Sequence, residues 1–109
     1  MSNRIEKINE LIKRHISEII TREINLKPGV FVTVTKVDTT PDLRYTRVFV
    51  SIFPEKETNY VMATFGKEAY SMQGILNKKL SMRPLPRIEF KVDLTEVKAD
   101  EIEKIIKQL

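Results

Sequence analysis

Residues 30–53, VFVTVTKVDTTPDLRYTRVFVSIF, decide the fold of this chain of 109 residues. Over 30–37 and again over 45–53, β-branched and aromatic residues alternate with polar ones, the period-two pattern of strands with one buried face. The connection from Asp38 to Leu43 is rich in turn formers and short. The stretch therefore predicts two antiparallel strands joined by a short loop.

Helical patterns lie on both sides of these strands. Residues 3–26 carry apolar side chains at the spacing of one helical face, and Pro28 and Gly29 end that pattern. A second helical pattern covers about 57–80, with its shared apolar face at Val61, Phe65, Ala69, Met72, Leu76 and Leu80. Its interior holds three poor helix formers, which predict a kink or a break near the middle: Gly66, Ser71 and Gly74.

The C-terminal third predicts one more strand and one more helix. Residues 87–93 alternate as a strand, and a short helix from about Lys98 places four apolar side chains on one face: Ile102, Ile105, Ile106 and Leu109. Every apolar face needs a partner, so the elements predict an α+β domain with a three-stranded sheet and helices on one face. At this length, residues 1–109 form one domain.

Composition excludes several classes of protein. The chain has no cysteine, which excludes disulfide frameworks, zinc knuckles and thiol catalysis. No apolar run approaches the roughly 18 residues of a membrane span, and the first residues lack the apolar segment of a signal peptide. We therefore expect a cytoplasmic protein with no membrane partner.

The residues also point away from catalysis. The single histidine, His15, lies at the margin of the apolar face of the first helix, where a structural role is the favoured interpretation over a catalytic one. There is no Gly-rich phosphate loop and no cluster of metal ligands in the sequence. We expect no enzymatic activity, no cofactor, no metal and no small-molecule substrate.

The net charge of +4 and its uneven distribution favour a polyanionic partner. Residues 54–87 hold six basic and three acidic side chains, whereas residues 88–109 hold four basic and six acidic ones. A helical wheel places Lys67, Ser71, Gly74 and Lys78 on the face opposite the apolar stripe, followed by Lys79, Arg83 and Arg87. Small residues between lysines allow a phosphate backbone to approach closely, so RNA contact is predicted here.

Several short motifs occur in an order typical of a known family. They are Val32-Thr33-Val34-Thr35-Lys36-Val37, Asp42-Leu43, Val48-Phe49-Val50-Ser51, Leu80, Arg83-x-x-Pro86, Ile88-x-Phe90, Asp93-x-Thr95, Ile102 and Ile105-Ile106-x-x-Leu109. In this order and spacing the chain resembles the ribosome-binding factor A (RbfA) family over essentially its whole length.

The resemblance implies a KH-like domain of the type II order αββααβ, with the short C-terminal helix added. It implies a non-enzymatic, monomeric factor that binds the small (30S) ribosomal subunit in late assembly. Such a factor helps 16S rRNA mature at its 5′ end and is associated with cold adaptation. We expect it to contact rRNA through the basic helix face and through Arg44 and Arg47 in the strand hairpin.

Ordinary KH domains clamp nucleic acid with a G-x-x-G loop, which this sequence lacks. The family replaces that loop by an interhelical A-x-G kink. Here the nearest match is Ala69-Tyr70-Ser71, with serine in place of the expected glycine.

Two alternatives stay open: a protein-binding adaptor whose charge serves only solubility, and a general RNA-binding module not dedicated to the ribosome. The salt dependence of binding separates RNA from protein partners, because RNA binding releases counterions.

Overall fold

The computed structural model describes residues 2–82 and 85–95, and its elements follow the predicted order. They are α1 (Ser2–Glu23), β1 (Phe31–Thr39), β2 (Tyr45–Phe53), the short 3-10 helix η1 (Glu55–Glu57), α2 (Thr58–Lys79) and β3 (Arg87–Val92). The second strand has the predicted bounds, and the other strands and both helices differ from prediction by three residues or fewer at each end. The predicted C-terminal helix lies outside the described residues.

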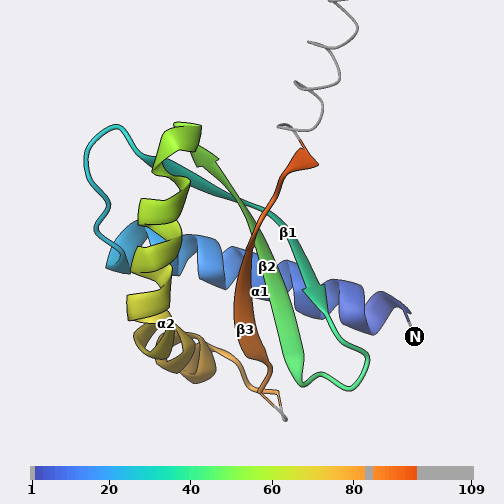
Figure 1. Cartoon of the computed structure of the whole chain (residues 1–109). Helices are drawn as coiled ribbons and strands as arrows, with labels where there is room; N and C mark the ends of the chain where they lie inside the picture. Colours follow the sequence, from blue (N-terminus) through green and yellow to red (C-terminus); the bar gives the residue numbers. More distant parts are fainter. Residues whose placement is uncertain (1, 83–84, 96–109) are drawn as a thin grey trace, which may run out of the picture.

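The sheet has the order β1-β2-β3, with β1 antiparallel to β2 and β3 parallel to β2. A parallel neighbour requires a crossover, and α2 supplies it between β2 and β3. Figure 1 shows α1 crossing behind the sheet and α2 standing beside it. The end of α2, the start of β3 and the loop between β1 and β2 lie at the same end of the molecule (Figure 1).

A β-bulge interrupts β1 at Thr35. Val34 pairs with Val50 and Lys36 pairs with Phe49, so Thr35 is an extra residue without its own partner. As a result, Thr35 and Lys36 are both exposed, whereas Val34 and Val37 are both buried.

The core lies between the helices and one face of the sheet. Its fully buried side chains come from both helices and from β2, and they include Ile12, Ile16, Val48, Val50, Val61, Phe65, Met72 and Leu76. The rings of Phe65 in α2 and Phe90 in β3 lie 4.6 Å apart. Burial of each such side chain contributes about 1.5–3 kcal/mol. The opposite side of the sheet, which we call the open sheet face, carries the exposed residues of all three strands.

The predicted break in the second helix is wrong. α2 is one helix of 22 residues that runs through Gly66, Ser71 and Gly74 without interruption. The buried residues on its apolar face, with Leu76 at one end and Val61 at the other, outweigh the weak helix propensity of the small residues. The described elements therefore follow the order αββαβ, with one helix in place of the expected pair. A bend at Ala69-Tyr70-Ser71, as distinct from a break, stays a prediction.

Within residues 2–82 and 85–95, neither helix has an apolar stretch of the length needed to cross a bilayer.

Candidate nucleic-acid interface

The solvent-facing side of α2 carries the predicted helix residues. Lys67, Ser71, Gly74 and Lys78 are all exposed, and so is Lys79 at the end of the helix. At 1.5 Å per residue, Lys67 and Lys78 lie about 16 Å apart along the axis. We call these five residues the α2 lysine face. Two of them, Ser71 and Gly74, have small side chains or none, so little side-chain bulk covers the helix backbone between the lysines.

The sequence suggests that the hydroxyl of Ser71 bonds to a neighbouring carbonyl or to a phosphate. Among the described residues it has no hydrogen-bond partner, whereas the hydroxyls of Thr58 and Thr64 in α2 donate to the carbonyls of Glu55 at 2.6 Å and Tyr60 at 2.9 Å. Ser71 is therefore available to a ligand.

A groove runs between α2 and the segment that leads into β3. Its volume is about 600 Å³, and it is lined by Gly66, Ala69, Tyr70, Gln73, Asn77, Leu85, Arg87 and Ile88. The side of the groove on α2 begins with two small residues, and the ring of Tyr70 stands beside them at 93% exposure. An aromatic ring held this far into solvent offers both faces for stacking.

Gln73 fastens α2 to the first residues of β3. Its Nε2 donates to the carbonyl of Pro86 at 3.0 Å and to Oδ1 of Asn77 at 2.9 Å, and its Oε1 accepts the backbone N–H of Ile88 at 2.9 Å. The side chain thus pairs with the backbone as a neighbouring strand would. This fixes the width of the groove.

Arg44 and Arg87 meet at the same end of the molecule. The backbone N–H of Arg87 donates to the carbonyl of Arg44 at 2.8 Å, and both side chains are exposed. Arg87 also lines the groove, so the structure brings both arginines close to the α2 side of the molecule.

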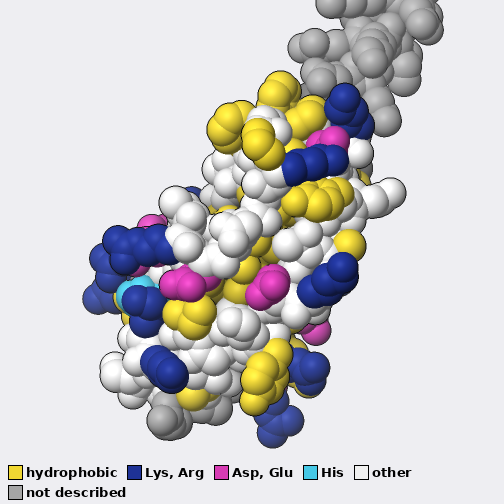
Figure 2. Space-filling model, turned by 90° about the vertical axis from the view of Figure 1, so that its left-hand side faces the viewer, with side chains coloured by type: hydrophobic (Ala, Val, Ile, Leu, Met, Phe, Trp, Pro, Cys, Tyr) yellow, Lys and Arg dark blue, Asp and Glu magenta, His cyan; other side chains and the backbone are white. Residues whose placement is uncertain are grey.

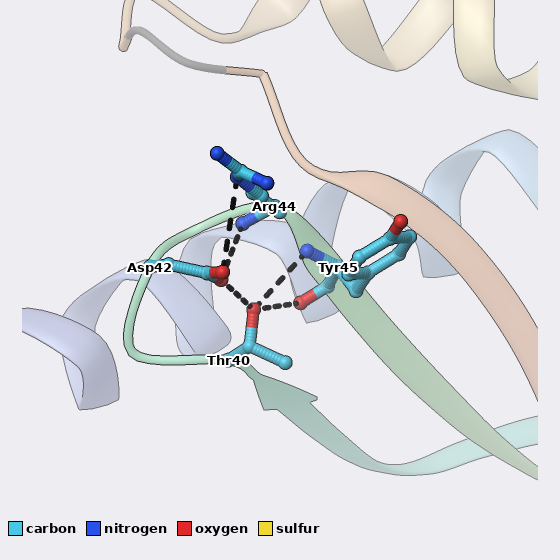
Figure 3. Close-up of polar contacts among 4 residues, drawn as sticks. All are labelled: Thr40, Asp42, Arg44 and Tyr45. Atoms are coloured by element: carbon cyan, nitrogen blue, oxygen red, sulfur yellow. Dashed lines mark hydrogen bonds and ion pairs between the residues drawn. The ribbon is translucent and has the colours of Figure 1, made fainter.

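The loop before Arg44 is held by the polar contacts of Figure 3. The hydroxyl of Thr40 donates to Oδ1 of Asp42 at 2.6 Å, and the N–H of Arg44 donates to the same oxygen at 3.1 Å. These two hydrogen bonds, with the Thr40 bond the stronger influence, lower the pKa of Asp42 below its usual value. Nε of Arg44 lies 3.8 Å from Oδ2 of Asp42, so part of the arginine charge is offset.

Leu43 completes this loop in the left-handed region, at φ 61°, with its side chain buried. A buried side chain anchors a backbone conformation that a leucine seldom adopts.

Arg47 lies apart from the other predicted site residues. It is exposed on the open sheet face, opposite Asp38 in β1 and Glu89 in β3. Two acidic neighbours make this position unfavourable for a phosphate. Arg83 lies outside the described residues.

The basic side chains on the α2 side do not form one continuous patch. Figure 2 shows Lys and Arg in separate groups with acidic side chains between them. A ligand for this side must therefore meet positive charge at several points, as the repeating phosphates of a nucleic acid do.

The groove residues Gly66, Gln73 and Asn77 are not among the predicted site residues. Their role is visible only in the folded structure, because Gln73 forms hydrogen bonds with residues 13 and 15 positions away in the sequence. Among the described residues, no group of His, Cys, Asp and Glu is arranged to hold a metal ion. His15 is half-buried in α1, and its Nδ1 has no hydrogen-bond partner in the described part of the chain.

Comparison with known proteins gives consistent likenesses. The family model described as ribosome-binding factor A matches residues 4–106. Ribosome-binding factor A of Natranaerobius thermophilus is 39% identical over 107 residues, covering 97% of this chain and 82% of that protein.

Solved structures agree. The crystal structure of ribosome-binding factor A from Thermus thermophilus superposes with a TM-score of 0.69 at 25% identity, covering 81% of this chain and 94% of that one. A homology model of the Thermus thermophilus protein, fitted into the cryo-EM map of a 30S–RbfA complex, gives a TM-score of 0.65 at 27% identity, with coverage of 78% and 90%. These likenesses confirm the predicted KH-like α+β fold class.

Proposed function

Because the chain belongs to the ribosome-binding factor A family, we propose that it binds the small ribosomal subunit through rRNA during late assembly. In this proposal it assists maturation of the 5′ end of 16S rRNA and catalyses no reaction itself. Residues 1–109 act as one RNA-binding domain.

The observation that carries the proposal is the combination of the α2 lysine face with the adjoining groove. Lys67 and Lys78 supply positive charge at two points about 16 Å apart on one helix. Ser71 and Gly74 lie between them and present little side-chain bulk. A phosphate backbone following the helix can therefore come close to it and meet a lysine near each end.

The groove adds a place for a base. The exposed ring of Tyr70 lies at its rim, and base stacking on such a ring contributes about 1–3 kcal/mol. Arg87 contributes a guanidinium group to the same groove. Gln73 holds both walls in place before RNA arrives, so little ordering of the protein is needed on binding.

The fitted 30S complex of the Thermus thermophilus relative supports the small subunit as the partner. By analogy with that family, we propose a cytoplasmic monomer that serves growth in the cold and needs no cofactor, metal or small-molecule substrate.

Co-sedimentation with ribosomal particles tests the proposal. The full chain is centrifuged with free small subunits, whole ribosomes and an unrelated structured RNA, at salt concentrations between about 50 mM and 200 mM. We expect binding to free small subunits only, and we expect it to weaken steeply as salt rises. The double variant Lys67→Glu/Lys78→Glu should bind weakly and with a smaller salt slope, by about one unit for each lost phosphate contact.

The matched control is Lys56→Glu, which makes the same Lys→Glu substitution once, in η1, before the start of α2. It should bind like the unmodified chain. Binding that does not respond to salt would favour the protein-binding adaptor, and equal binding to the unrelated RNA would favour a general RNA-binding module.

A further inference from the structure

The open sheet face carries a row of three side chains that runs across all three strands. Phe49 in β2 lies directly opposite Lys36 in β1 and directly opposite Lys91 in β3. Adjacent strands are about 4.8 Å apart, so a lysine residue lies beside the aromatic residue on each neighbouring strand. Nζ of Lys36 lies 5.8 Å from the centre of the Phe49 ring. Both lysines are exposed, and in the described part of the chain neither forms an ion pair.

Aromatic rings also repeat along β2 on this face. Tyr45, Phe49 and Phe53 occur every fourth residue, which places successive rings about 13 Å apart. Tyr45 is 45% exposed and Phe53 is 67% exposed. Phe53 lies opposite Phe31, which is 65% exposed, and Tyr45 lies opposite Arg87.

Polar rows separate these rings. Asp38, Arg47 and Glu89 form the row between Tyr45 and Phe49, and Thr33 and Ser51 lie between Phe49 and Phe53. A protein partner normally covers a broad contiguous apolar patch, whereas here the apolar contact between neighbouring strands is limited to the pair Phe31 and Phe53 at one end of the face. Single-stranded nucleic acid presents separate flat bases joined by charged phosphates, which matches isolated rings with lysines beside them.

Three acidic residues lie near these basic side chains on the sheet. Asp38 and Glu89 both lie opposite Arg47. Oδ2 of Asp93 accepts the hydroxyl of Thr35 at 2.6 Å. Lys36 and Lys91 remain exposed and form no ion pair among the described residues, and the charge of Lys36 acts on the nearby carboxylate of Asp93.

We propose that the open sheet face binds single-stranded RNA, with bases stacked on Tyr45, Phe49 and Phe53 and phosphates held by Lys36 and Lys91. A hollow of about 660 Å³ beside Phe49 and Lys91 provides room for a base. This is a second RNA surface, separate from the α2 lysine face. It rests on the proposed function only in taking RNA as the partner.

The test uses the full chain and a short adenylate oligonucleotide, either alone or paired with its complementary strand. Backbone amide chemical shifts locate the bound oligonucleotide, and titration gives the Kd. We expect the single strand to shift the amides of β1, β2 and β3 and to bind more tightly than the duplex. The variant Tyr45→Ser/Phe53→Ser should weaken binding roughly tenfold for each ring.

The matched control is Ile5→Ser, which removes a half-buried aliphatic side chain near the start of α1, on the other side of the sheet (Figure 1). It should change the Kd little. Because both substituted aromatic residues are exposed, the double variant should keep its fold, and its amide spectrum checks this.

Three outcomes would overturn the proposal. The first is an unchanged Kd in the folded double variant. The second is a set of shifts confined to α2, which would leave the proposed function standing while removing this second surface. The third is that the single strand and the duplex bind with the same Kd, which would exclude base stacking on this face.

Discussion

Oε1 of Gln73 accepts a hydrogen bond from the backbone N–H of Ile88, 15 residues later in the sequence, and this bond ties α2 to the edge strand β3. The same amide donates to the carbonyl of Pro86. Loss of the side-chain amide would leave two backbone groups without their partners.

Replacement of Gln73 by leucine should therefore lower the free energy of unfolding by about 1–3 kcal/mol, because leucine can neither donate nor accept. The variant Gln73→Glu keeps the acceptor for Ile88 but places a carboxylate oxygen against the carbonyl of Pro86, where the amide nitrogen lies at 3.0 Å, so it should lose at least as much stability as the leucine variant. Urea unfolding measures all three proteins. Equal stability of the leucine variant and the unmodified chain would contradict the role of this contact.

The buried hydroxyls of Thr39 and Thr46 give a second prediction. They lie opposite each other in β1 and β2, 2.9 Å apart, and both residues are almost fully buried. Thr46→Val should cost about 1–3 kcal/mol, because it leaves the hydroxyl of Thr39 buried and unpaired. The double variant Thr39→Val/Thr46→Val removes both hydroxyls and should recover most of that loss. A double-mutant cycle from thermal unfolding checks this, and additive losses would contradict it.

Asp93 should make the stability of the fold depend on acid pH. The hydroxyl of Thr35 is the first cause and hydrogen bonds from Thr95 the second, and together they lower the pKa of Asp93 from 3.8 to about 2. A lowered pKa means that the folded state favours the charged carboxylate. The resulting stabilisation is present above pH 3.8 and is lost as the pH falls toward 2. In the variant Thr35→Ala, an NMR titration should place the pKa of Asp93 closer to 3.8, and the stability difference from the unmodified chain should vanish near pH 2.

A substitution at Gly74 should change stability and binding in opposite directions. A methyl group added there would meet nothing within 4 Å, and the position is in the interior of α2. Gly74→Ala should therefore raise the free energy of unfolding by about 0.5–1 kcal/mol. It should also weaken association with the small subunit several-fold, because the methyl group keeps a phosphate away from the α2 lysine face. Thermal unfolding and co-sedimentation measure the two effects, and unchanged association would show that close approach is not needed at this residue.

Local pattern is enough to predict most of the fold. The alternation of apolar and polar residues over 45–53 predicts the bounds of β2, because successive side chains of a strand point to opposite faces of the sheet. The predicted break in α2 is wrong because helix propensity is local, whereas the packing of Phe65 and Met72 that overrides it comes from the rest of the chain.

In the candidate site, too, local pattern predicts some features, whereas others depend on contacts between distant parts of the chain. The exposure of Lys67 and Lys78 follows from the helical period alone. The isolation of Arg47 depends on the register of three strands, which brings Asp38 and Glu89 beside it. The role of Gln73 depends on contacts between residues far apart in sequence, and no short-range pattern reports such contacts.

Because of the bulge at Thr35, β1 can lose one residue without a change in the pattern of its side chains. A residue removed from the middle of a regular strand sends every later side chain to the wrong side of the sheet. Thr35 is supernumerary in the ladder, so its deletion would leave Val34 and Val37 pointing inward and Lys36 pointing outward. What disappears is the extra local twist and the tie from Thr35 to Asp93. The hairpin of β1 and β2 thus contains one residue that the alternation of its side chains does not need. A chain without Thr35 keeps the same residues on each face of the sheet.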